Sequence, residues 1–199
     1  DIQKRLAGAD EARVRSWSHG AVAALYALSR ELRLAELIDR HLSNSGRRMR
    51  TSCNKPAPIP PQINDGLSVG ESLTLVAIGR ACHATSKRAF AGWAKTTTLG
   101  QLAGVEAERL TSQHFWDQMD QLPVELIEPI ERELISDVVQ RFELPLDTLL
   151  FDATNFFTFI ASDNRRCELP ARGKQKQKRN DLRQVGVALL CSRQHGIPL

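Results

Sequence analysis

The sequence predicts an α+β protein in which a helical N-terminal region, residues 1–144, precedes a β-rich region, residues 145–199. Three observations lead to this division. Before Pro145, apolar residues recur three and four positions apart, which places them on one face of a helix. After Pro145 this period is lost, and two apolar runs rich in β-branched and aromatic residues are typical of strands. A polar, basic stretch separates the two runs.

The composition is that of an ordinary globular protein, with 42% hydrophobic and 25% charged residues. The cysteines are scattered and form neither a CxxC pair nor a zinc-finger pattern with the histidines, which favours a reducing compartment. No stretch approaches the roughly 18 apolar residues that span a membrane. The first residues also lack the apolar core of a signal peptide. We therefore expect a cytoplasmic protein without a membrane partner.

The first predicted helical block covers residues 20–42, either as two helices or as one with a break near Arg33. Residues 43–66 are polar and proline-rich. Because proline lacks a backbone donor and forbids a regular helix, we expect a linker or exposed loop there, centred on the tract 54–62.

A second helical block should begin after Ser68, which has Glu71 at capping-box spacing. Its expected common face consists of Leu73, Val76, Ala77 and Arg80. Residues 83–86 interrupt the block, and a helix restarts toward Trp93 with Lys87 and Arg88 at its beginning. This helix–break–helix could read DNA as a helix-turn-helix, although two packed helices of a bundle fit the pattern better.

Two further helices are expected before Pro145. Thr111 or Ser112 should cap a helix that holds Phe115, Trp116 and Met119, and Pro123 should open another that ends near Phe142. Trp93 and Trp116 lie on apolar faces and are interpreted as core residues. The five histidines form no catalytic order or metal motif and are interpreted as surface or hydrogen-bonded side chains.

In the β-rich region, residues 149–160 should begin as a strand, 161–182 should form a loop and 184–191 a second strand. A short turn, 192–196, would then lead into a third strand at Ile197.

Positive charge is concentrated in one segment. The net charge is +4, but residues 165–183 alone carry eight basic and two acidic side chains, or +6. This distribution favours a local contact with a polyanion. The alternative is a solvated, mobile loop. The side chains expected to contact nucleic-acid phosphates are Arg172, Lys174, Lys176, Lys178, Arg179 and Arg183.

Asp152 stands in the middle of the first apolar run. A charge on a buried strand is costly unless it is paired or bound, and a metal ion held against phosphates would explain both the carboxylate and the nearby basic segment. The alternative, about equally supported by the pattern alone, is that Asp152 caps a turn at Thr154 and Asn155 and binds backbone amides.

Two strings resemble the bacterial insertion-sequence DDE transposases of the IS-four-like group. Leu-Leu-Phe-Asp-Ala-Thr-Asn-Phe-Phe at 149–157 is similar to the strand carrying that family's first catalytic aspartate. Residues 172–190 are similar to its glycine-x-serine-lysine, arginine and aspartate-leucine-x-glutamine signature, with matches at Gly173, Lys176, Arg179, Asp181, Leu182 and Gln184. Gln175 replaces the usual serine, and Ala153 a common threonine. The region before residue 144 is similar to a lesser degree, at Thr85-Ser86-Lys87-Arg88, Trp93 and residues 115–120.

The resemblance implies a ribonuclease-H-like catalytic fold that begins at about residue 145. Three acids would bind two Mg²⁺ or Mn²⁺ ions, and Asp152 would be the first of them, both metal ligand and catalytic residue. The second and third acids would lie beyond Leu199. Since the chain lacks an initiator Met and ends like a strand just beginning, we expect a fragment that binds the ions weakly and does not cut DNA alone.

The resemblance also implies the partners, namely insertion-sequence terminal repeats, target DNA and a second subunit in a synaptic complex. Such a bacterial protein would be associated with the nucleoid. Two alternatives remain: a DNA-binding or regulatory protein without catalytic activity, and another ribonuclease-H-like nuclease.

Overall fold

The computed structural model describes residues 16–52, 66–158, 169–173 and 181–199. Contacts divide the chain into two units, Asp1–Leu134 and Ile135–Leu199, and each unit is described by itself. Their division falls inside a helix, ten positions before the boundary that the sequence pattern suggests at residue 144.

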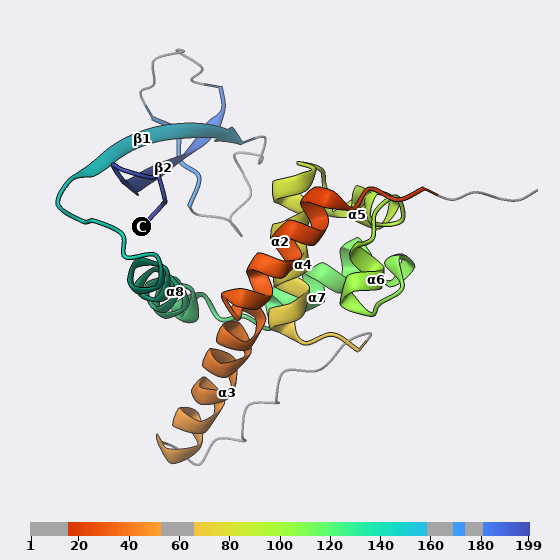
Figure 1. Cartoon of the computed structure of the whole chain (residues 1–199). Helices are drawn as coiled ribbons and strands as arrows, with labels where there is room; N and C mark the ends of the chain where they lie inside the picture. Colours follow the sequence, from red (N-terminus) through yellow and green to blue (C-terminus); the bar gives the residue numbers. More distant parts are fainter. Residues whose placement is uncertain (1–15, 53–65, 159–168, 174–180) are drawn as a thin grey trace, which may run out of the picture. The chain divides into compact units, whose positions relative to one another are not determined.

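Helices account for all the regular structure described in the first unit (Figure 1). They are α2 (Gly20–Glu31), α3 (Leu34–Ser52), α4 (Val69–Cys82), α5 (Lys87–Ala94), α6 (Leu99–Ala103), α7 (Ser112–Asp120) and α8 (Ile127–Arg141), the last continuing into the second unit. Two 3₁₀ turns, Ala107–Arg109 and Val124–Leu126, precede α7 and α8 respectively. No described helix is both long and apolar enough to cross a bilayer.

The first helical block breaks where the sequence predicted. Arg33 separates α2 from α3 with a positive φ of 52°, a left-handed conformation that ends the first helix. The loop predicted from residue 43 is wrong over its first ten positions, because α3 continues to Ser52. The prolines that exclude helix begin only at Pro56, so nothing before them forces an earlier stop. The tract 54–62 lies outside the described residues.

Side-chain caps define where three helices begin. The predicted capping box of α4 is confirmed: Ser68 Oγ accepts from the N–H of Glu71 at 3.1 Å, and the N–H of Ser68 donates to Glu71 Oε2 at 2.8 Å. Ser86 caps α5 in a similar way, with one such bond. Of the two candidates for α7, Thr111 is the cap, and its hydroxyl accepts from the N–H of His114 at 3.1 Å.

The buried face of α4 differs from the predicted one. Ala77 and Arg80 are exposed, whereas the buried positions include Gly70 and Gly79. A Cβ on Gly70 would overlap the carbonyl of Ala35 in α3, and one on Gly79 would overlap the ring of Phe90 in α5. Glycines, rather than large apolar residues, therefore mark where neighbouring elements approach α4 most closely.

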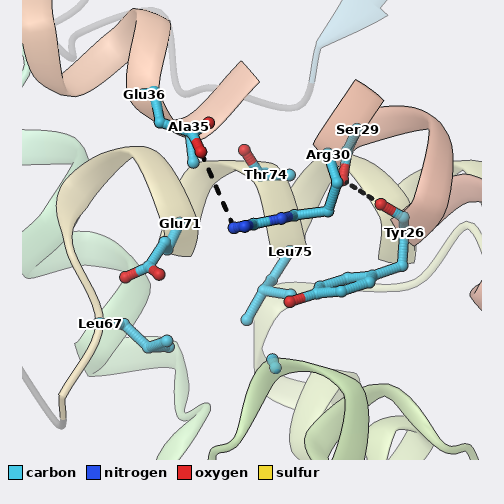
Figure 2. Close-up of a pocket in the computed structure, with 10 residues that line it drawn as sticks. Tyr26, Ser29, Arg30, Ala35, Glu36, Leu67, Glu71, Thr74 and Leu75 are labelled. Carbon is cyan, nitrogen blue, oxygen red and sulfur yellow. Dashed lines mark hydrogen bonds and ion pairs between the residues drawn. The ribbon is translucent and has the colours of Figure 1, made fainter. Parts of the chain in front are cut away.

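A small pocket lies where α2, α3 and α4 meet (Figure 2). Tyr26 and Leu75 form apolar walls, and Arg30 approaches Glu36 at 3.8 Å along its polar side. Only about 20 Å³ of the pocket can take the centre of a water molecule. This is room for one or two waters rather than for a metabolite.

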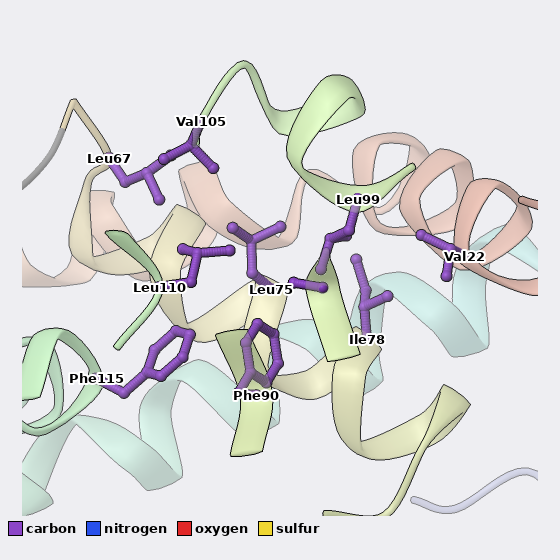
Figure 3. Close-up of a cluster of buried hydrophobic side chains, with 10 residues drawn as sticks. Val22, Leu67, Leu75, Ile78, Phe90, Leu99, Val105, Leu110 and Phe115 are labelled. Atoms are coloured by element: carbon purple, nitrogen blue, oxygen red, sulfur yellow. The ribbon is translucent and has the colours of Figure 1, made fainter. Parts of the chain in front are cut away.

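Side chains from α2, α4, α5, α6 and α7 pack together in the core of the first unit (Figure 3). Helix α3 contributes none of them. The buried members of this core are Val22, Leu67, Leu75, Ile78, Phe90, Ala94, Leu99, Val105, Leu110 and Phe115. The rings of Phe90 and Phe115 meet edge to face, with centroids 4.7 Å apart. A second cluster, centred on Leu37, Val69 and Ile130, joins α3, α4 and α8.

The two tryptophans interpreted as core have different environments. Trp93 is partly buried against the core, as predicted. Trp116 is 50% exposed, so its prediction is wrong. Its neighbour Phe115 takes the buried position on α7, and the ammonium of Lys87 lies 4.1 Å from the Trp116 ring centroid.

The second unit contains a two-stranded antiparallel sheet of β1 (Leu149–Thr158) and β2 (Arg183–Ser192). Pairing runs without a bulge from Leu149↔Ser192 to Thr158↔Arg183. This confirms both strands and the mixed α+β class. The third strand predicted at Ile197 appears as a single bridge, Cys191↔Pro198, and residues 159–168 and 174–180 of the predicted loop lie outside the described residues.

Candidate metal ligand and nucleic-acid contacts

Asp152 lies near the middle of β1, directly across from Leu189. Its side chain is exposed, and so are those of Leu150 (53%) and Phe151 (70%) beside it. The expectation of a charge on a buried strand is therefore wrong for the described residues. An apolar run indicates that a strand can be covered, but burial requires a covering element. Asp152 consequently pays little desolvation cost here.

One hydrogen bond defines the orientation of the Asp152 carboxylate. Its Oδ1 accepts from the backbone N–H of Ala153 at 2.9 Å. The turn proposed as an alternative is absent, because Thr154 and Asn155 continue the strand. The backbone amide that Asp152 does bind is that of its neighbour Ala153 within the strand.

The surroundings of Asp152 on its own face of the sheet are mostly apolar. Because side chains alternate along a strand, it shares this face with Leu150 and Thr154 of β1 and with Leu189 of β2. No group of three or more His, Cys, Asp or Glu side chains suited to a metal occurs among the described residues. Two metal ions need several carboxylates together, so the described residues do not form a complete two-metal centre around Asp152.

The predicted phosphate contacts are described only in part. Lys174, Lys176, Lys178 and Arg179 lie outside the described residues. Arg172 is exposed and follows Ala171, which pairs with Gln184. Arg183 is partly buried at the start of β2, where its Nε donates to the carbonyl of Pro170 at 2.5 Å.

Asp152 and Arg183 lie far apart along the sheet. Arg183 pairs with Thr158, six positions beyond Asp152 on β1. At about 3.3 Å per residue this separation is roughly 20 Å. The structure therefore brings Arg172 and Arg183 together at the start of β2, but it does not bring either arginine to Asp152.

Gln184, part of the string that resembles the transposase signature, is packed rather than exposed to solvent. It pairs with Phe157, so it lies on the face opposite Asp152. Its amide approaches Gly173 so closely that a Cβ there would lie 2.7 Å from Gln184 Nε2. Its Oε1 is buried and meets no hydrogen-bond donor among the described residues. The close contact between Gly173 and Gln184 thus keeps residues 171–173 beside β2.

The helical unit contains a buried polar chain that the sequence did not indicate. His114 Nε2 lies 3.0 Å from Ser72 Oγ, and Ser72 Oγ donates to the carbonyl of Ser68 at 2.8 Å. Since the single hydroxyl hydrogen of Ser72 is used there, Nε2 of His114 must be the donor to Ser72. Both side chains are at most 3% exposed, so this polar pair lies in the interior, where it joins α4 to α7. The general prediction for the histidines is confirmed in this case.

No protein-family model, no curated protein and no solved structure matched this chain.

Proposed function

We propose that the chain belongs to a DNA transposase of the IS-four-like DDE type, which would bind, cleave and transfer insertion-sequence ends. In this proposal Asp152 is the first catalytic acid, and the basic segment 172–183 contacts the phosphates. One observation supports it above the others. The first string lies within β1, with Asp152 near its middle, and the end of the second string, from Arg183 on, lies within β2, which pairs with β1 in register over ten residues.

The chemistry of the strand pair agrees with that role. A carboxylate on a regular strand is held rigidly, as a metal ligand must be, and its exposure leaves it accessible to an ion and a phosphate. When bound, Mg²⁺ or Mn²⁺ would stabilise the attacking and leaving oxygens of a phosphodiester. Asp152 is the one ligand that this proposal assigns among the described residues.

A non-catalytic DNA-binding protein is the second candidate. It is favoured by the exposed Arg88 and by the Lys87–Trp116 pair, which place positive charge and an aromatic ring on one surface of the helical unit. Such a protein would need the basic residues but not Asp152.

The proposal is tested by the salt dependence of DNA binding, followed by fluorescence anisotropy of a labelled duplex. Each phosphate contact contributes a slope of about 0.9 in log affinity against log salt. The variant K174A/K176A/K178A/R179A should therefore lower the slope by up to about 3.6. Its matched control, K174R/K176R/K178R, keeps the charge and should keep the slope.

Two results would contradict the proposal. One is failure of the wild-type chain to bind duplex DNA at low salt. The other is a slope that the alanine variant leaves unchanged, since the basic segment would then make no phosphate contact.

A further inference from the structure

A buried hydroxyl in the helical unit lacks a hydrogen-bond partner among the described residues. Thr74 lies on the buried face of α4 and is 5% exposed, and its Oγ1 is shielded from solvent. Ser72, two positions earlier, donates its own hydroxyl hydrogen to the carbonyl of Ser68. Thr74 makes no equivalent bond to its helix. A hydroxyl that leaves water without a new partner destabilises the folded state, so this group requires an explanation.

Thr74 lines the small pocket where α2, α3 and α4 meet. Figure 2 shows its hydroxyl directed towards Ala35 and Glu36 on α3. The pocket offers about 20 Å³ to the centre of a water molecule. A single water needs roughly 10–15 Å³ of such volume, whereas a metabolite needs several hundred. The size of the pocket therefore selects a ligand as small as water.

The polar groups of the lining favour a ligand that can donate two hydrogen bonds. Ser29 Oγ donates its one hydrogen to the carbonyl of Tyr26 at 2.8 Å, so the same oxygen can only accept a further bond. The ionised carboxylates of Glu36 and Glu71, which also line the pocket, are acceptors as well. A water molecule has two donors and two acceptor sites. It can therefore accept from Thr74 and still donate to two groups of the lining.

We propose that one ordered water molecule occupies this pocket as the hydrogen-bond partner of Thr74. The water accepts from Thr74 Oγ1 on α4 and donates to Ser29 Oγ on α2 and to the Glu36 carboxylate on α3. One molecule thus connects three helices. A cation is disfavoured there by the Arg30 guanidinium on the same lining, and an anion by the acceptors. This inference does not depend on the proposed transposase function.

A crystal structure of the whole chain that shows ordered waters is the direct test. The expected result is a water within about 3.2 Å of Thr74 Oγ1 and of at least one other polar atom of the lining. Thr74→Ser keeps the hydroxyl and should keep this water, whereas Thr74→Val should lose it. A wild-type structure in which the pocket is well ordered and contains no water would overturn the proposal.

The direction of the stability change gives a second measurement. If a water satisfies the hydroxyl, Thr74→Val removes a hydrogen bond and should raise the equilibrium constant for unfolding about twofold to tenfold in a urea titration. If the hydroxyl were instead buried without any partner, the same variant would remove an unsatisfied group and would lower that constant. A lowered constant for Thr74→Val would therefore overturn the proposal.

Thr97 is the matched control because its hydroxyl is equally buried but bonded only within the protein. It is 4% exposed, donates to the carbonyl of Ala94 at 3.0 Å and accepts from the N–H of Leu99 at 3.2 Å. Thr97→Val should raise the unfolding constant whether or not water is bound at Thr74. Neither substitution touches the basic segment, so the salt dependence of DNA binding should not change. The water site and the transposase proposal can therefore fail separately.

Discussion

At the scale of single residues, two glycines determine how closely helices pack in the first unit. Gly70 places α4 against the backbone of Ala35, and its N–H donates to Asp39 Oδ1 at 2.8 Å. Gly79 accommodates the ring of Phe90 in the core. The group that faces Gly70 is the backbone carbonyl of Ala35, which cannot move aside as the end of a side chain can. Gly70 is therefore the less replaceable of the two.

Substitution of Gly70 by Ala should lower the free energy of unfolding by about 1–3 kcal/mol, because the new methyl group overlaps the Ala35 carbonyl. Gly92 in α5 is the matched control, since it is exposed and a Cβ there would meet nothing within 4 Å. Gly92→Ala should instead stabilise the helix by about 0.5–1 kcal/mol. Urea unfolding of both variants decides the matter, and equal effects at the two positions would contradict this explanation.

At the scale of elements, helix starts in this protein are set by local side-chain caps. The Ser68–Glu71 box, Ser86 and Thr111 each satisfy amides that their helices cannot. Such signals lie within four residues of sequence, which is why the starts of α4 and α7 could be predicted. The five-residue α6 has no side-chain cap and no room for an apolar period, and it was not predicted.

The assignment of Thr111 rather than Ser112 as the cap of α7 can be measured directly. Thr111→Ala removes the acceptor for the N–H of His114 and should cost about 1 kcal/mol in the free energy of unfolding. Ser112→Ala, one residue later, leaves that bond in place and should change stability by less than about 0.5 kcal/mol. Chemical denaturation of the two variants would show the reverse order if Ser112 were the cap.

At the scale of the whole molecule, the chain combines a well-packed helical unit with a second unit whose strand pair is largely exposed. In the first unit, ten side chains form one buried cluster. In the second, Leu150, Phe151, Phe156 and Leu189 remain between 48% and 70% exposed. Among the described residues, the two buried apolar clusters therefore lie before residue 135, whereas Asp152, the proposed first acid, lies after it.

The 199-residue chain should not nick supercoiled plasmid in the presence of Mg²⁺ or Mn²⁺, since its described residues contain no group of three or more side chains suited to a metal, and the two-metal reaction needs several carboxylates together. Agarose electrophoresis of the treated plasmid is the measurement, with Asp152→Ala as the control for a contaminating nuclease. Robust cleavage that disappears in this variant would show that the chain completes a metal centre after all.

The sequence predicted the fold more fully than the site. The break at Arg33, the Ser68 cap and both strands follow from local rules of backbone and periodicity. The buried face of α4 does not follow from these rules, because glycine gives no apolar signal although it allows the closest contacts. The exposure of Asp152 depends on what covers β1, and no pattern within residues 149–157 encodes that. The pairing of Gln184 with Phe157, which separates it from Asp152, likewise required the register.

The chain of hydrogen bonds from His114 through Ser72 to Ser68 has a consequence for local unfolding. Ser68 both caps α4 and accepts from Ser72, and Ser72 is bonded to α7 through His114. If α7 separates, Ser72 loses its buried partner next to the residue that starts α4. We therefore expect the first turn of α4 and helix α7 to open as one cooperative unit, with one free energy of opening shared by their amides.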